Sequence, residues 1–66
     1  MDLRVNGQPC QVPPDTTVLA LLHGLEVPVD GVAVAVNHAV VPKSAHAQQK
    51  LDPGDDVEII QAVGGG

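Results

Sequence analysis

The sequence predicts a single domain of the α+β class, in which a mixed sheet of four to five strands carries one main helix on one face. Strand-like alternation of apolar and polar residues marks both ends of the chain, and a helical spacing of apolar residues lies between them. The length of 66 residues excludes a second domain. The residues are 44% hydrophobic but include no Phe, Trp or Tyr, so the core must be thin and aliphatic. Such a core leaves no room for a deep active-site cavity, which argues against a self-contained enzyme.

Residues 1–12 predict a β-hairpin. Alternating apolar and polar residues run up to Asn6-Gly7, a dipeptide that tolerates the positive φ angles of a two-residue turn. A turn of this length places Leu3 opposite Cys10. We therefore expect Cys10 to share the face of the sheet that Leu3 occupies.

A short helix is expected after the hairpin. Thr17 is a suitable N-cap for it. The i, i+3, i+4, i+7 spacing of a helix face follows in Val18, Leu21, Leu22 and Leu25. Gly24 stands where a left-handed C-cap would end the helix. Two turns of helix do not persist alone, so this face must pack across the sheet.

Residues 32–36 alternate valine with alanine and predict a strand whose two faces differ in side-chain size. Asn37-His38 then turns the chain. A short strand is expected at residues 40–41, stopped by Pro42 because proline cannot donate to a ladder.

The last third of the chain predicts a turn and a final strand. Ser44 is expected to cap a brief helical turn through Gln49. Residues 52–55, Asp-Pro-Gly-Asp, are a strong turn signal. Residues 57–63 form the last strand, which gives the order strand, strand, helix, strand, short strand, strand.

The charge balance constrains the partners. Eight acidic residues against three basic ones give a formal net charge of −5. This balance argues against nucleic acid, whose phosphates require cations, and against an anionic membrane surface. It favours a partner protein with a basic docking surface. No apolar run approaches the roughly 20 residues of a membrane span.

The same features indicate a cytoplasmic protein. The first residues lack the apolar segment of a signal peptide. Cys10 is the one cysteine of the chain, so no internal disulfide contributes to stability and no oxidising compartment is needed.

The sequence ends in Gly64-Gly65-Gly66. A terminal glycine run can be merely a flexible tail. Chemically, it offers a carboxylate on a thread without side chains, which can enter a narrow channel of a partner enzyme. A carboxylate is a poor electrophile until another protein activates it, typically as an acyl adenylate formed with ATP. The run therefore indicates a carrier whose partners perform the chemistry.

The chain resembles the ThiS family, the sulfur carrier proteins of thiamine biosynthesis, which have the ubiquitin-like β-grasp fold. The resemblance covers the whole chain, and the order and spacing of its segments are more specific than any one of them. The matching segments are Val5-Asn6-Gly7, Thr17-Val18-Leu19-Ala20-Leu21-Leu22, Val32-Ala33-Val34-Ala35-Val36-Asn37, Val41-Pro42, Gly54-Asp55-Asp56-Val57-Glu58-Ile59 and Ala62-Val63-Gly64-Gly65-Gly66. The resemblance implies a β-grasp domain over residues 1–63 and a flexible glycine tail over residues 64–66.

The resemblance also implies a carrier cycle. A ubiquitin-activating-type adenylyltransferase (ThiF-like) adenylates Gly66 with ATP and Mg, and sulfur from a cysteine desulfurase then leaves a thiocarboxylate. A thiazole synthase (ThiG-like) uses this sulfur to build the thiazole ring of thiamine. Gly65 and Gly66 match the glycine pair of the family motif. Gly64 has a supporting role in the tail that enters the partners' active sites. The chain itself binds no cofactor and holds no catalytic residue.

Three alternatives remain open at this point. The small subunit of molybdopterin synthase uses the same carboxyl chemistry but donates sulfur to a pterin, although the length of 66 residues favours the thiamine carrier. Covalent protein tagging through Gly66 is a second alternative. The third is a non-covalent β-grasp binding module in which the tail has no role.

The remaining polar residues give weaker signals. Cys10 has no neighbouring base or helix N-terminus to activate it, so core packing is favoured over reactivity. The histidines lack metal-ligand spacing and are expected to face solvent; they are His23, His38 and His46. Four acids near the last strand could form a partner-facing patch or a solvated turn; they are Asp52, Asp55, Asp56 and Glu58. No metal site is expected.

Overall fold

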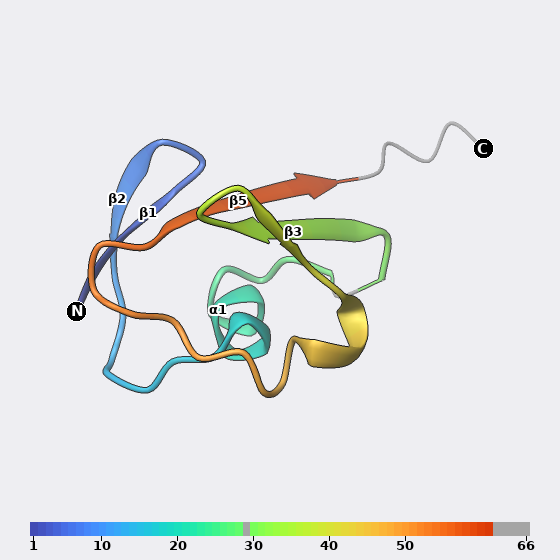
Figure 1. The fold of residues 1–66 in the computed structure, drawn as a ribbon, viewed down its shortest axis with the longest axis horizontal. Coiled ribbons are helices and arrows are strands. Elements are labelled where there is room, and N and C mark those ends of the chain that lie inside the picture. Colours follow the sequence, from blue (N-terminus) through green and yellow to red (C-terminus); the bar gives the residue numbers. More distant parts are fainter. Residues whose placement is uncertain (29, 62–66) are drawn as a thin grey trace.

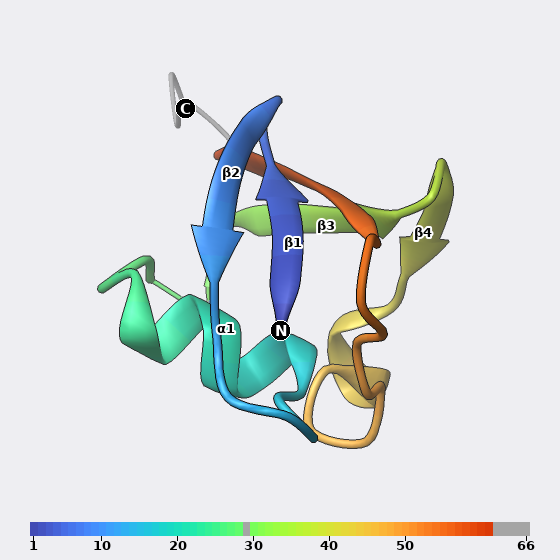
Figure 2. The same ribbon diagram turned by 90° about the vertical axis from the view of Figure 1, so that its left-hand side faces the viewer.

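The computed structural model of the chain describes residues 1–28 and 30–61. Within these residues, one mixed sheet of five strands has the order β2-β1-β5-β3-β4 (Figures 1 and 2). The strands are β1 (Asp2–Val5), β2 (Gln8–Gln11), β3 (Val32–Val36), β4 (Ala39–Val41) and β5 (Asp56–Gln61). The helix α1 (Val18–Gly24) packs on one face, and a 3-10 turn, η1 (Lys43–Ala45), follows β4. The predicted α+β class is confirmed.

The hairpin of β1 and β2 has the predicted register. Leu3 lies opposite Cys10, and the backbone N–H of Val12 donates to the carbonyl of Met1 over 3.0 Å. Asn6 and Gly7 form the turn, with φ angles of 51° and 81°. Both angles lie in the left-handed region, which is why this dipeptide rather than two bulkier residues occupies the turn.

The last strand lies in the middle of the sheet. It runs parallel to β1, with Val5 opposite Val57, and antiparallel to β3, from Val32 opposite Gln61 to Val36 opposite Val57. A parallel pair needs a long crossover, and nearly all of the chain between β1 and β5 supplies it. The predicted strand over residues 57–63 begins one residue earlier, at Asp56, and its last two positions lie outside the described residues.

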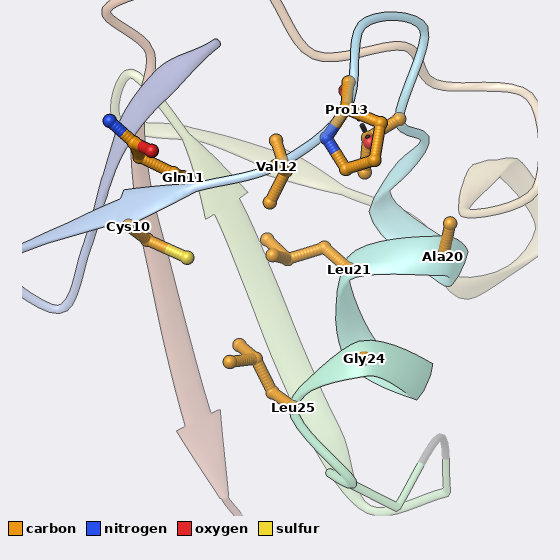
Figure 3. Close-up of a pocket in the computed structure, with 9 residues that line it drawn as sticks. Cys10, Gln11, Val12, Pro13, Ala20, Leu21, Gly24 and Leu25 are labelled. Carbon is orange, nitrogen blue, oxygen red and sulfur yellow. Dashed lines mark hydrogen bonds between the residues drawn. The ribbon is translucent and has the colours of Figure 1, made fainter.

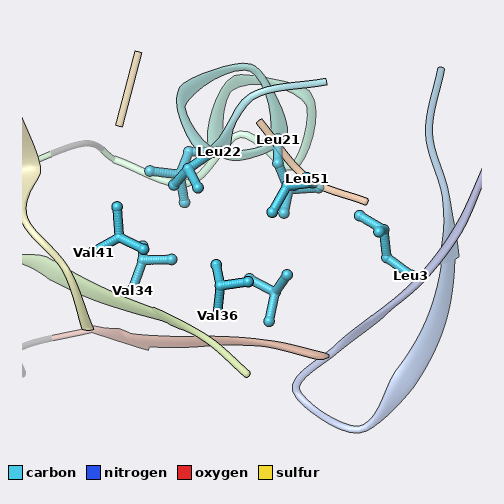
Figure 4. Close-up of a cluster of buried hydrophobic side chains, with 9 residues drawn as sticks. Leu3, Leu21, Leu22, Val34, Val36, Val41 and Leu51 are labelled. Carbon is cyan, nitrogen blue, oxygen red and sulfur yellow. The ribbon is translucent and has the colours of Figure 1, made fainter. Parts of the chain in front are cut away.

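The core lies between the sheet and α1 (Figure 4). Its buried members are all aliphatic: Leu3, Val18, Leu21, Leu22, Val34, Val36, Val41, Leu51 and Val57. In β3 the valines face this core, and Ala33 lies exposed on the opposite face, as the alternation predicts. Leu25, the fourth predicted core position of the helix, is 41% exposed because the helix ends before it.

The N–H groups in the first turn of α1 find hydrogen-bond acceptors in two segments of the chain. The hydroxyl oxygen of Thr17 accepts from the N–H of Ala20 over 3.1 Å, which confirms the predicted N-cap. The N–H groups of Val18 and Leu19 donate to the carbonyls of Gln49 and His46, both over 2.9 Å. The segment after η1 therefore supplies acceptors that a short helix cannot supply for itself.

The helix does not end at Gly24 with a left-handed residue, so that prediction was wrong. Gly24 is helical, and the residue with positive φ is Glu26, at 57°. The N–H of Glu26 donates to His23, and the N–H of Val27 donates to Leu22. These two bonds form a Schellman motif with Glu26 at C′. Val27 packs against the core beyond it, and this apolar contact sets where the chain turns.

The helical turn after β4 also differs from the prediction. It starts at Lys43, and Ser44 lies inside it rather than capping it. Pro42 is the residue before the turn, with φ of −60° and ψ of 148°, and its carbonyl accepts from the N–H of Ala45 over 2.8 Å. Proline has no side-chain acceptor, and no side chain caps this turn.

The placement of the helix end is tested by stability measurements. Gly24→Ala should raise the free energy of unfolding by about 0.5–1 kcal/mol, because alanine loses less entropy in a helix. A Cβ at Gly24 would meet no atom within 4 Å. Glu26→Gly should also stabilise, since it relieves a left-handed residue that carries a Cβ. Urea denaturation measures both variants, and a less stable Gly24→Ala protein would contradict the assigned helix end.

Candidate functional site

The predicted site residues Gly64, Gly65 and Gly66 lie outside the described residues, as does the end of the predicted domain at residue 63. The described structure instead shows the strand that precedes them. β5 ends at Gln61, and the sequence then continues Ala62-Val63-Gly64-Gly65-Gly66. The geometry of the candidate site is therefore that of β5 and of the sheet face beside it.

The C-terminal half of β5 is held by a side chain of the hairpin turn. β1 ends at Val5, so the N–H of Ile59 has no strand residue opposite it on that side. The amide oxygen of Asn6 accepts from this N–H over 2.8 Å, and the N–H of Asn6 donates to the carbonyl of Val57 over 2.8 Å. Asn6 thus extends the ladder beyond β1 as well as forming the turn. Sequence reasoning assigned it only the turn.

The start of β5 is held in a similar way by Asn37, in the turn between β3 and β4. Its amide group donates to the carboxylate of Asp55 and accepts from the N–H of Asp56, both over 3.0 Å. The other carboxylate oxygen of Asp55 accepts from the N–H of Asp52 over 2.8 Å. Asp55 therefore has a structural role, and the acidic cluster is partly a turn rather than a free patch.

An apolar patch lies on the sheet face away from the helix, close to the end of β5. We call it the outer-face patch, and its members are Ala33, Ala35, Val40 and Ile60. Ala33 lies opposite Ile60, and Ala35 lies opposite Val40. Val40 is 75% exposed and Ile60 is 60% exposed. An exposed apolar patch of this kind is typical of a docking surface.

Acidic residues border this patch along β5. Glu58 lies opposite Ala35, and Asp56 lies opposite Arg4 of β1. The His38 ring nitrogen Nδ1 lies 3.4 Å from the Glu58 carboxylate, with both side chains exposed. The patch thus has an apolar centre and a mainly acidic border.

An exposed ion pair ties the loop before β3 to η1. The Lys43 ammonium donates a hydrogen bond to the Asp30 carboxylate, and this bond, together with charge attraction, holds the pKa of Asp30 below its usual value. The stability that it contributes is present above the ordinary carboxylate pKa and is lost as the pH falls. Both side chains are solvated, so the pair adds little to the fold.

The histidines and the cysteine differ in burial. His23 and His38 are exposed as predicted, but His46 is 1% exposed, so its predicted exposure was wrong. His46 Nε2 lies 3.1 Å from the carbonyl oxygen of Val41 and must donate to it, which lets the ring pack under β4. Cys10 is partly buried against the core, as predicted. Among residues 1–28 and 30–61, no cluster of His, Cys, Asp or Glu could hold a metal ion.

No helix in the described part of the chain is long and apolar enough to cross a membrane.

A model of the ThiS family matches residues 3–66. The chain is 33% identical over its full length to the sulfur carrier protein ThiS of Escherichia coli, which it covers completely. It is 42% identical to a segment of a thiazole synthase of Paramagnetospirillum magneticum and 35% identical to a segment of a thiazole synthase of Magnetococcus marinus. The chain spans 20% of the length of each of these two relatives.

The fold has a close counterpart among solved structures. The crystal structure of the thiamine biosynthesis protein ThiS from Geobacter metallireducens superimposes with a TM-score of 0.87 at 35% sequence identity, and each chain is covered completely. The predicted β-grasp fold is therefore confirmed.

The role of Asn6 is tested by replacing it without disturbing the turn. Asn6→Gly keeps the left-handed backbone but removes the acceptor for the N–H of Ile59, at a cost of about 1 kcal/mol. Hydrogen exchange of the Ile59 amide should then accelerate roughly fivefold. Asn6→Asp keeps an acceptor oxygen and should leave that exchange rate nearly unchanged. Equal exchange rates in the two variants would show that Asn6 does not hold β5.

Proposed function

The chain belongs to the ThiS family, and on this premise we propose that it is a sulfur carrier protein of thiamine biosynthesis, not an enzyme. The observation that carries the proposal is the match over the whole chain to the carrier of E. coli, together with a fold at a TM-score of 0.87 to a ThiS crystal structure. The outer-face patch fits a protein that is handed between partner enzymes. The aliphatic core fits a domain whose task is to present a group rather than to enclose a substrate.

The carrier chemistry that we propose takes place at Gly66. Its carboxylate attacks the α-phosphate of ATP in an activating enzyme, which releases pyrophosphate and leaves an acyl adenylate. A thiol reductant releases hydrosulfide from the persulfide of a cysteine desulfurase, and this hydrosulfide then displaces AMP and leaves the C-terminal thiocarboxylate. ATP and Mg belong to the activating partner, and Gly65 and Gly64 supply a thread without side chains that fits its channel.

The partner that receives the sulfur is proposed to be a thiazole synthase of the ThiG type. Support comes from the two relatives in which a segment similar to this chain is part of a longer protein named thiazole synthase. A carrier segment within the same polypeptide as the synthase favours thiazole formation over donation to a pterin. The activating enzyme is proposed to be a ThiF-like adenylyltransferase.

Both partners are expected to dock on the outer-face patch. The patch adjoins the end of β5, so it lies close to where a partner that takes up the C-terminal residues would contact the domain. The formal net charge of −5 and the acids along β5 favour basic side chains around an apolar contact on the partner.

The proposed chemistry is tested by the intact mass of the chain. After incubation with ATP, Mg, sulfide and the activating enzyme, the mass should rise by the difference between one sulfur and one oxygen atom. Oxidation of Met1 or Cys10 adds nearly the same mass, so the control is a chain that lacks Gly66 but keeps both residues. No gain in the full chain, or an equal gain in the control, would refute the carrier chemistry.

The docking surface is tested separately. Ile60→Ser should raise the KM of the activating enzyme for the chain about tenfold, because an exposed apolar anchor is lost. Its kcat should change little, because Ile60 lies six residues before the carboxylate of Gly66 in the sequence. Leu25→Ser removes another exposed apolar side chain, away from β5, and should leave KM unchanged. Equal effects of the two substitutions would rule out the outer-face patch.

A further inference from the structure

The gap between α1 and the sheet is closed along one edge and open along the other. Below β4, the segment after η1 fills the gap, and His46 is buried there (Figure 2). Beside β2, at the opposite edge, a groove of about 350 Å³ remains. Its lining residues are Cys10, Gln11, Val12, Pro13, Thr16, Ala20, Leu21, Gly24 and Leu25.

The groove is apolar and is kept open by small residues. Figure 3 shows Cys10 and Val12 on the strand side, with Leu21 and Leu25 pointing toward them from α1 and its end. On the helix side, Ala20 contributes one methyl group and Gly24 contributes none. A Cβ at Gly24 would meet no atom within 4 Å, so the groove is open beside Gly24.

Unpaired backbone groups of β2 lie directly beside this groove. Met1 and Val12 exchange backbone hydrogen bonds in both directions. Such pairs alternate with non-bonded pairs in an antiparallel ladder, so Asp2 and Gln11 form a non-bonded pair. The N–H and carbonyl of Gln11 therefore point away from β1, and no strand of the described chain lies on that side.

Pro9 restricts what can pair with this edge. Pro9 lies two residues before Gln11 in β2, so its backbone groups also point away from β1. Proline has no N–H to donate on that side. A long partner strand therefore cannot add along the whole of β2. Pairing is possible only at Gln11, next to the apolar groove, and this fixes its register.

We propose that this edge binds an extended segment of a partner protein, which pairs with the backbone of Gln11 and inserts an apolar side chain between β2 and α1. Main-chain pairing would supply orientation, and the pocket between Cys10 and Leu25 would select the side chain. The site lies at the opposite edge of the sheet from β4, and its described lining residues run from Cys10 to Leu25. It is therefore independent of the proposed carrier chemistry.

The charges around the groove define the partner segment further. Asp15 precedes the lining residue Thr16, and Glu26 follows Leu25; both acids are exposed, and the Asp15 carboxylate lies 3.9 Å from the Lys50 ammonium. The groove lining contains no basic residue. The formal net charge of −5 favours a bound segment that carries basic residues on either side of its apolar centre. A second copy of this chain, with a formal net charge of −5, would be repelled.

The probe is an acetylated and amidated peptide, Lys-Val-Ile-Val-Lys, titrated into the full chain and followed by amide NMR. Saturable shifts should concentrate at Gln11 and Leu25, and exchange of the Gln11 amide should slow. The same peptide with N-methylated valines should bind at least about tenfold more weakly, because it loses backbone donors. A chain lacking Gly66 should bind the peptide as the full chain does.

Two variants of one residue separate backbone pairing from side-chain contact. Gln11→Pro removes the outward N–H and, like Gln11→Ala, the side-chain hydrogen bond to Asp2, and it should weaken binding about tenfold. Gln11→Ala keeps the N–H and should change binding less than about twofold. Gly24→Leu should block the groove, whereas His23→Leu, an exposed neighbour on the same helix, should not.

Several results would overturn the proposal. These are absence of saturable binding at millimolar peptide, shifts concentrated at Val40 and Ile60, and equal affinities of the Gln11→Pro and Gln11→Ala variants. Gln11 shifts that depend on protein concentration without peptide would identify a second copy as the occupant and would also overturn it. Unfolding of Gln11→Pro would not rescue the proposal, because the N-methylated peptide tests the same hydrogen bond in the unaltered chain.

Discussion

The insertion of the last strand between the first and the third is the constraint on which the rest of the structure depends. β5 joins the hairpin of β1 and β2 to the pair of β3 and β4, because it is hydrogen-bonded to β1 on one side and to β3 on the other. Val57 is fully buried where the two halves meet. Asn6 and Asn37 supply hydrogen bonds to β5 beyond the reach of its neighbours. The segment that leads to the proposed reactive glycine is thus the one that the fold holds from both sides.

The helix depends on a second, smaller interaction. α1 has seven residues, too few to be stable alone, and its first N–H groups are satisfied by Thr17 and by carbonyls of residues 46–49. This segment closes the gap between helix and sheet on the β4 side, and nothing equivalent closes it beside β2 in the described structure. Because the segment that caps the helix lies on the β4 side, the groove beside β2 stays open. Two faces are then available to partners, one beside the end of β5 and one beside β2.

Local signals in the sequence predicted most of the fold. Asn6-Gly7 determined the hairpin register, because few residues accept two consecutive positive φ angles. The helix end was misplaced because the contact of Val27 with the core decided it, and that tertiary contact placed a glutamate rather than Gly24 at positive φ. The burial of His46 could not be predicted, since its partner is a backbone carbonyl of β4 that any residue at position 41 would supply. The same holds for the bond from Ile59 to Asn6, which joins residues far apart in the sequence.

The chain thus combines a folded domain with a C-terminal segment that bears the proposed reactive carboxylate. The most direct test is to prepare the chain by ligation with a sulfur-labelled thiocarboxylate at Gly66 and to supply it to a thiazole synthase with its other substrates, in the absence of the activating enzyme. If the chain is the sulfur donor, the label appears in the thiazole product and the chain returns with an ordinary carboxylate. Formation of an unlabelled thiazole while the chain keeps its label would contradict it.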